Sequence, residues 1–276
     1  MHIATIQGDY PLAEHNKDLV DNRSWSGISR NLLKMIAITT ITVGHFFLYT
    51  FSKHRCFGAS GVMIGLMTMV CFIGPPIFMF FIAEGFRYTS SKMRYGRRLL
   101  IFALITQLIF AVTTADGLGF DVMRFFFAWN VFFALFIGFL DLCILNSKMK
   151  LPVRILLVAA TLALTYFLSA EWMVFGPLMI IAFYYLKDRK IIAFIVAELL
   201  VYLTFFFADC GLDGSFQLNF LSNQMKYILP YSAIGIFLVL FLYKGRNGKK
   251  NKFIQYFFYV FYPLHLLLID LVLLLA

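Results

Sequence analysis

The chain consists of long apolar segments that alternate with short polar or basic connections. About 20 apolar residues are needed to cross a bilayer as a helix, and 61% of the 276 residues are hydrophobic whereas 14% are charged. This composition excludes a water-soluble globule and predicts an all-α, polytopic membrane bundle of about nine transmembrane helices. The apolar segments run approximately over 32–51, 62–86, 99–112, 123–145, 153–168, 174–186, 191–207, 227–242 and 254–275.

Lys and Arg residues are distributed unevenly over the connections. Twenty of the 24 fall within the first 34 residues or after the second, fourth, sixth and eighth apolar segments. The other four are Lys53, Arg55, Arg124 and Lys226. By the positive-inside rule, this pattern predicts a cytoplasmic N-terminus, an extracytoplasmic C-terminus and a multi-pass protein of the bacterial cytoplasmic (inner) membrane. The net charge of +10 then reflects topology, and we expect the lipid bilayer as partner and no nucleic acid.

The polar, mixed-charge region 1–30 is predicted to be a cytoplasmic tail without a cleavable export signal. Residues 31–276 are expected to form a single transmembrane domain. The cysteines lack the CxxC spacing of zinc or redox sites, so we expect no metal. Both Cys56 and Cys210 fall in predicted outer loops, so a disulfide between them is one of the alternatives that the sequence allows. The four cysteines are Cys56, Cys71, Cys143 and Cys210.

Ionisable side chains within the apolar segments are the first functional candidates, because each costs a few kcal/mol in hydrocarbon. Asp141 and Asp270 lie near segment ends and are expected to be hydrated there. Glu198 lies within the seventh segment. The full set is Lys34, His45, Glu84, Asp141, Glu198, His265 and Asp270.

Lys34 and His45 are predicted to share one helix face. Their separation of 11 residues corresponds to three turns and about 16.5 Å along the axis. A cation at the inner edge and an imidazole deep in the membrane suit a path along which an anionic ligand meets a base. The alternative is that Lys34 extends to the interface and His45 bonds a neighbouring helix.

His265 lies halfway along the last apolar segment, beside Tyr262 and Pro263. A second imidazole at a depth similar to that of His45 allows a shared polar site between the first and last segments. A purely structural role for His265 is the alternative.

Glu84 lies near the inner end of the second apolar segment, which contains Gly74-Pro75-Pro76. Two prolines remove backbone donors, and such breaks are common where a span borders a cavity. Glu84 could therefore order an inner gate or hold Lys34. An ion pair with Arg87, three residues later, is equally compatible with the sequence.

Four blocks of sequence resemble the TraX-like membrane proteins, a family named for the conjugal-transfer pilin acetylase. The first runs from Leu32 to His45, and the second from Pro76 to Arg98 and includes Glu84-Gly85-Phe86-Arg87-Tyr88-Thr89. The third, Asn130 to Gly138, is weaker. The fourth is the most specific, an aromatic run from Tyr256 that ends in Tyr262-Pro263-Leu264-His265-Leu266. The spacing of Lys34 and His45 is also similar to the basic-x10-His signature of the acyltransferase-three group.

The resemblance implies acyl transfer from cytoplasmic acetyl-CoA to an extracytoplasmic acceptor, either a pilin-like protein or a cell-surface glycan. On this hypothesis His45 acts as general base or becomes transiently acylated, and His265 orients it or shares the proton. Lys34, Glu84 and Tyr262 are the other catalytic candidates. Candidate acceptor-binding residues on the outer side are Asn130 and Glu171. The candidate phosphate contacts for acetyl-CoA are Lys34, Arg94, Arg97, Arg98, Lys249 and Lys250.

The sequence departs from the family pattern at two positions. Gly44 stands where an Asp usually precedes the histidine, and Phe72 stands where an Arg usually precedes the second-segment prolines. Two other functional classes therefore stay open. One is a proton-coupled transporter that uses Glu198 and the histidines. The other is a catalytically inactive assembly partner.

Overall fold

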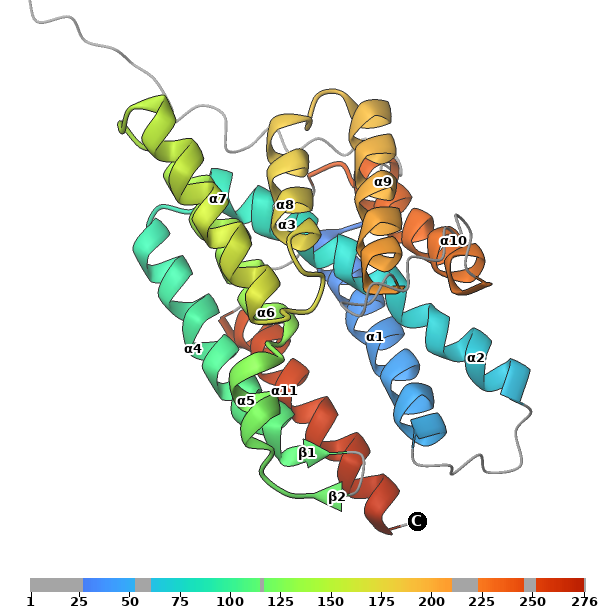
Figure 1. Cartoon of the computed structure of the whole chain (residues 1–276). Helices are drawn as coiled ribbons and strands as arrows, with labels where there is room; N and C mark the ends of the chain where they lie inside the picture. The colour runs from blue at the N-terminus through green and yellow to red at the C-terminus, as the bar shows by residue number, and fades with distance from the viewer. Residues whose placement is uncertain (1–26, 53–60, 115–116, 210–222, 246–251, 276) are drawn as a thin grey trace, which may run out of the picture.

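The computed structural model describes residues 27–52, 61–114, 117–209, 223–245 and 252–275 as a bundle of helices (Figure 1). The described residues also include one antiparallel pair of two-residue strands, β1 and β2, besides the connections between helices. The helices and strands are α1 (Arg30–Ser52), α2 (Gly61–Met69), η1 (Val70–Ile73), α3 (Gly74–Tyr88), α4 (Lys92–Val112), β1 (Thr113–Thr114), β2 (Gly117–Leu118), α5 (Val122–Phe127), α6 (Val131–Leu145), α7 (Leu151–Phe167), α8 (Phe175–Tyr185), α9 (Lys190–Asp209), α10 (Asn223–Phe237), η2 (Leu238–Leu242) and α11 (Lys252–Leu275).

The helical, membrane-type architecture predicted from hydropathy is confirmed. Within the described residues, five helical stretches are long and apolar enough to cross a bilayer, and four shorter apolar helices accompany them. The shorter ones cover Leu151–Phe167, Phe175–Tyr185, Ile228–Leu242 and Tyr256–Val272. Nine crossings and the orientation of the termini stay predictions.

The connections sort to two ends of the bundle. The α6–α7 and α8–α9 connections lie at one end, and the β1–β2 hairpin and the end of α11 lie at the other (Figure 1). This arrangement agrees with the distribution of basic residues along the sequence, because the α6–α7 and α8–α9 connections are both basic.

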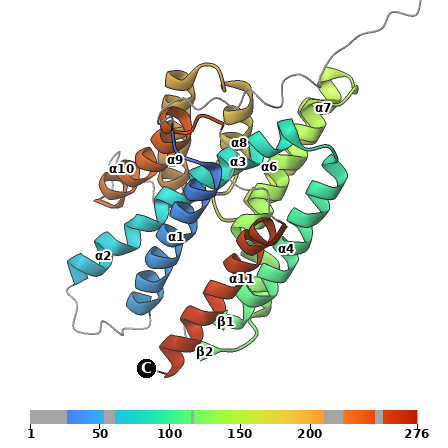
Figure 2. The same ribbon diagram turned by 180° about the vertical axis from the view of Figure 1, so that it is seen from behind.

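Helix α1 contacts α2, η1, α3 and α11; Figure 2 shows α1 beside α11 from behind. Small residues permit close approaches between neighbouring helices. A Cβ built on Gly44 of α1 would lie 2.3 Å from the Cβ of Cys71 in η1, and one on Gly235 of α10 would lie 2.2 Å from the carbonyl oxygen of Ile73. Membrane helices commonly pack through small residues in this way.

Two sequence expectations about charged residues are wrong. The apolar pattern places Arg94, Arg97 and Arg98 in the connection after the second segment, but α4 already begins at Lys92, so they occupy its first two turns. Asp141 and Asp270 were expected to be hydrated, but both are fully buried, at 0% exposure. Thr161 of α7 covers Asp141 and donates a hydrogen bond to its Oδ1 at 2.5 Å.

Candidate active site

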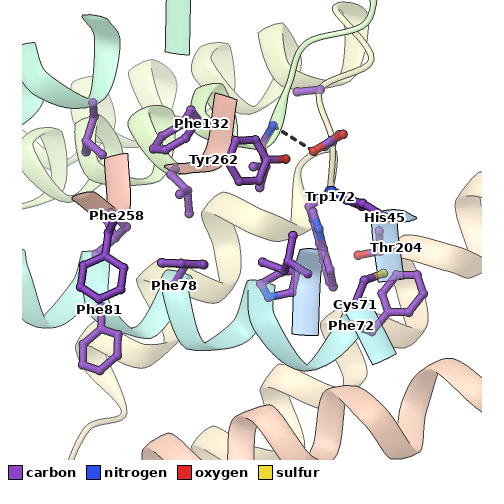
Figure 3. Close-up of a pocket in the computed structure, with 18 of the residues that line it drawn as sticks. His45, Cys71, Phe72, Phe78, Phe81, Phe132, Trp172, Thr204, Phe258 and Tyr262 are labelled. Carbon is purple, nitrogen blue, oxygen red and sulfur yellow. Dashed lines mark hydrogen bonds between the residues drawn. The ribbon is translucent and has the colours of Figure 1, made fainter. Parts of the chain in front are cut away.

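An apolar cavity of about 440 Å³ lies inside the bundle. Figure 3 shows Phe81 and Phe258 at one end, and Cys71, Phe72 and Thr204 at the other. Lys34 and His45 both line the cavity, as the shared helix face predicts. Most of its wall is apolar; the polar and ionisable side chains in it are Lys34, His45, Cys71, Tyr95, Ser169, Glu171, Thr204, Tyr259 and Tyr262.

The two intramembrane histidines meet, as the sequence allowed. His45 Nδ1 lies 2.9 Å from His265 Nε2, and the two rings stack with centroids 5.2 Å apart. On the far side of the pair, His265 Nδ1 lies 3.3 Å from the carbonyl oxygen of Phe261. Tyr262 stands edge-on to His45, with ring centroids 6.3 Å apart.

These contacts assign the proton positions in the neutral pair. A carbonyl oxygen only accepts, so His265 Nδ1 carries the hydrogen and donates it to Phe261. The lone pair of His265 is then on Nε2, and His45 Nδ1–H must donate to it. This leaves an unprotonated Nε2 on His45, the histidine that lines the cavity. His265 is not among the lining residues, so it orients His45 from behind.

Lys34 lies between two aromatic rings, at the end of the cavity opposite His45. Its ammonium lies 5.5 Å from the ring centroid of Phe81 and 5.1 Å from that of Phe258. Within the described part of the chain, no ion pair to Lys34 is found. Lys34 thus offers a positive charge to an anionic group that enters the cavity.

Glu84 has neither of the partners considered from the sequence. Its carboxylate binds Arg30 of α1 at 2.9 Å and accepts a hydrogen bond of 2.8 Å from the hydroxyl of Tyr243. Arg87 instead donates to the backbone carbonyls of Phe183 and Tyr184 at the end of α8. Glu84 therefore connects α1 and α3 to Tyr243, which follows η2, and it does not line the cavity.

The Arg30–Glu84 pair is expected to stabilise this junction. The side chains are 31% and 10% exposed, so a double-mutant cycle with Arg30→Gln and Glu84→Gln should give a coupling free energy of about 0.5–3 kcal/mol. The measurement is the unfolding free energy of each purified variant in detergent. Strictly additive effects of the two substitutions would show that the pair contributes nothing.

Glu171 lies in the connection between α7 and α8, and residues Ser169 to Met173 all line the cavity. Its Oε2 accepts a hydrogen bond of 3.0 Å from the backbone N–H of Val131, in the first turn of α6. The Tyr262 hydroxyl lies within hydrogen-bonding reach of the same carboxylate. The structure thus brings Glu171 and Tyr262 to the cavity that His45 also lines.

Asn130 is placed differently from Glu171. It is fully buried and its Oδ1 caps α6 by accepting from Phe132 N at 2.9 Å. Its Nδ2 donates to Gln107 Oε1 at 2.7 Å and to the carbonyl of Ala103 at 3.0 Å. Asn130 is not among the residues that line the cavity; its assignment to acceptor binding stays a prediction.

Among the other candidate phosphate contacts, the three arginines of α4, Arg94, Arg97 and Arg98, are not residues that line the cavity. Arg94 and Arg97 are exposed on α4, whereas the half-buried Arg98 lies over the ring of Tyr95, 5.6 Å from its centroid. Since Tyr95 lines the cavity, Arg98 is the nearest of these three arginines to it by contact. Lys249 and Lys250 fall outside the described residues, as do Cys56 and Cys210.

The two departures from the family pattern have structural counterparts. Gly44 faces the backbone of Cys71 closely enough that no side chain fits there. Phe72 packs edge-on against Trp172 and Phe205, with ring centroids 6.3 and 5.1 Å away. An aromatic cluster therefore occupies the part of the cavity wall where the resemblance implies a charged arginine.

Sequence reasoning missed Arg30 and Tyr243 as partners of Glu84, and Trp172 and Phe205 as cavity walls. Glu84 is separated from Arg30 by 54 positions and from Tyr243 by 159, so no local pattern could reveal the cluster. The position of Arg30 at the very start of an apolar segment was the one available signal.

Comparison with known proteins identifies the family of this chain. The profile of one family, described as "TraX protein", matches residues 29–273. The chain is 28% identical over 259 residues to a protein from Dichelobacter nodosus named as a probable fimbrial assembly protein FimC, serogroup H1. That alignment covers 88% of this chain and 97% of the relative. No solved structure matches. The chain has the apolar helices of a membrane protein and belongs to the TraX family.

Proposed function

We propose that this protein is a membrane acetyltransferase that moves an acetyl group from cytoplasmic acetyl-CoA to an extracytoplasmic acceptor. The observation that carries the proposal is the hydrogen-bonded pair of His45 and His265 beside a cavity that also holds Lys34. His45 is a base at one end of this apolar cavity, and Lys34 is a cation at the other. This arrangement suits an elongated substrate whose reactive group lies near His45 and whose anionic group lies near Lys34.

In the proposed reaction, His45 Nε2 takes the proton of the acceptor nucleophile as that nucleophile attacks the thioester carbonyl carbon. The new bond to the acyl carbon forms, the carbon–sulfur bond breaks, and His45 returns the proton to the leaving thiolate. The positive charge on the imidazole during this exchange is stabilised through the Nδ1–H hydrogen bond to His265.

The donor would enter from the end of the cavity at which Lys34 lies. Lys34 and Arg98 would contact its anionic groups, and Arg94 and Arg97 would attract it electrostatically from exposed positions on the same helix as Arg98. The thioester arm would then extend along the Lys34–His45 face. Whole CoA need not cross the membrane.

The acceptor is proposed to be a pilin-like protein, with a cell-surface glycan as the alternative. The name of the Dichelobacter nodosus relative, a fimbrial assembly protein, supports the first. The same name also supports a second candidate function, an assembly partner of pilins without turnover. The absence of an Asp before His45 and of an Arg at Phe72 agrees with that second candidate.

A proton-coupled transporter is less well supported. Glu198 of α9, the acid on which that hypothesis depends, accepts hydrogen bonds of 3.2 Å from Ser232 of α10. It is absent from the lining of the cavity that holds His45, so the two do not form a common pathway through that space.

The proposed function predicts that the purified protein in detergent binds radiolabelled acetyl-CoA and slowly releases labelled acetate, because water can replace the missing acceptor as nucleophile. Equilibrium binding and label release are the measurements, and this assay needs no knowledge of the acceptor. Binding without release in folded protein would favour the assembly partner. Absence of binding would contradict the acetyltransferase.

A further inference from the structure

The carboxylate of Glu171 is held from two sides. Val131 N–H donates to its Oε2 at 3.0 Å, and the hydroxyl of Tyr262 is within hydrogen-bonding reach. Both Glu171 and Tyr262 line the cavity beside His45. Tyr262 is buried at 8% exposure, and its ring lies 5.1 Å from that of His265.

The loop that carries Glu171 has an unusual backbone. Ser169, Trp172 and Met173 have φ values of 44°, 66° and 41°, a region that costs non-glycine residues of the order of 1–3 kcal/mol each. Hydrogen bonds hold the loop in place: Glu171 N donates to the Trp129 carbonyl at 2.8 Å, and Trp129 N donates to the Leu168 carbonyl at 3.3 Å. Strain of this kind collects where a side chain must be positioned for function.

The direction of a hydrogen bond between the Tyr262 hydroxyl and the nearby Glu171 carboxyl would depend on protonation. An ionised carboxylate only accepts, so the Tyr262 hydrogen is then committed to Glu171. A protonated carboxyl can donate to the Tyr262 oxygen instead. In that state the phenolic hydrogen is released and can be donated into the cavity.

Burial raises the pKa of the Glu171 carboxyl to about 7, because the Val131 N–H, Arg124 and Tyr262 offset only part of the cost of holding its charge away from water. Cys71 also faces this carboxyl. The groups that face Tyr262 are Glu171, Tyr49, Cys71, His45 and His265. With this pKa, protonated Glu171 predominates below pH 7 and the carboxylate predominates above it.

We propose that the Tyr262 hydroxyl donates a hydrogen bond to the thioester carbonyl oxygen as it becomes an oxyanion, and that Glu171 in its protonated form positions that hydroxyl. Tyr262 is then a catalytic residue and Glu171 a positioning residue. This inference rests on the acyl transfer proposed above. No net proton is gained or lost at Glu171 during turnover.

Glu171→Gln is the decisive variant, because glutamine reproduces the protonated carboxyl. Its amide N–H donates to the Tyr262 oxygen and its amide oxygen accepts from Val131 N–H. The measurement is release of acetate from radiolabelled acetyl-CoA between pH 6 and 9. We expect the variant and the wild type to release acetate at similar rates at pH 6. Above pH 7, the ratio of the variant rate to the wild-type rate should rise about tenfold per pH unit, as for a single titrating group.

Tyr262→Phe tests the donor itself and also serves if Glu171→Gln does not fold. Loss of an oxyanion donor costs about 10²–10³-fold in rate, so we expect that deficit at pH 6 and a progressively smaller one above pH 7. In the double variant, Glu171→Gln should have no further effect. Glu198→Gln is the matched control: this carboxylate lies outside the cavity, and its substitution should leave the pH profile unchanged.

The outcomes separate this inference from the proposed function. If the wild type releases no acetate, both are wrong. If it does, but folded Glu171→Gln is inactive at every pH, the carboxylate itself is required as a base and the positioning role is overturned. A constant ratio across the pH range, or full activity in Tyr262→Phe, overturns it as well and leaves acyl transfer intact.

Discussion

His45→Ala is expected to lower the rate of acetyl-CoA hydrolysis by about 10²–10⁴-fold, the range found for removal of a general base. His45 is the histidine that lines the cavity, and the hydrogen-bond chain to Phe261 through His265 keeps its Nε2 unprotonated and available. Label release by the purified variant, compared with the wild type at equal acetyl-CoA occupancy, is the measurement.

His265→Ala is expected to have a smaller effect, because His265 acts through His45. His265→Gln should recover part of the loss, since its amide oxygen can accept the Nδ1–H of His45. Thr42→Val is a suitable control on the same helix. Among the described residues, the Thr42 hydroxyl donates to the Ile38 carbonyl of α1 alone, at 2.7 Å, and Thr42 does not line the cavity. If neither histidine substitution to Ala reduces turnover more than tenfold, the proposed chemistry is wrong.

Hydropathy was sufficient to predict the helical bundle, because about 20 apolar residues have few alternatives to a membrane helix. It failed at α4, where the basic residues Arg94 to Arg98 resemble a loop although they form the first turns of the helix. It also failed for Asp141 and Asp270, because depth along a segment does not reveal which neighbouring helix covers a side chain. Burial of these acids depends on packing between helices.

The site was predictable to the extent that it consists of ionisable residues within apolar segments. His45 and His265 could be paired from their similar depths, because each needs a polar partner in hydrocarbon. The Arg30–Glu84–Tyr243 cluster could not be predicted, since charges at segment ends have many candidate partners. The proximity of Glu171 to Tyr262 also had no sequence signal, because it depends on a loop with three positive φ angles turning toward the cavity.

Gly44→Asp, which restores the residue that usually precedes the histidine in the family, is expected to disrupt the protein rather than improve it. A Cβ at position 44 would lie 2.3 Å from Cys71 Cβ and 2.7 Å from Cys71 N, so α1 and η1 would have to separate. Overpacking of this kind costs about 1–3 kcal/mol, and an aspartate at the centre of a membrane helix costs about 2.5–3.5 kcal/mol. The two together are a large part of the stability of a typical domain.

The thermal unfolding midpoint of the detergent-solubilised protein measures this effect. Gly44→Ala isolates the steric part and should itself lower the midpoint, whereas Gly65→Ala should not, because a Cβ on Gly65 would meet nothing within 4 Å. The Cβ of residue 44 points at Cys71, so an aspartate there is directed toward η1. A Gly44→Asp variant that folds normally and turns over faster would show that η1 can move away from α1, and that a carboxylate at this position assists His45.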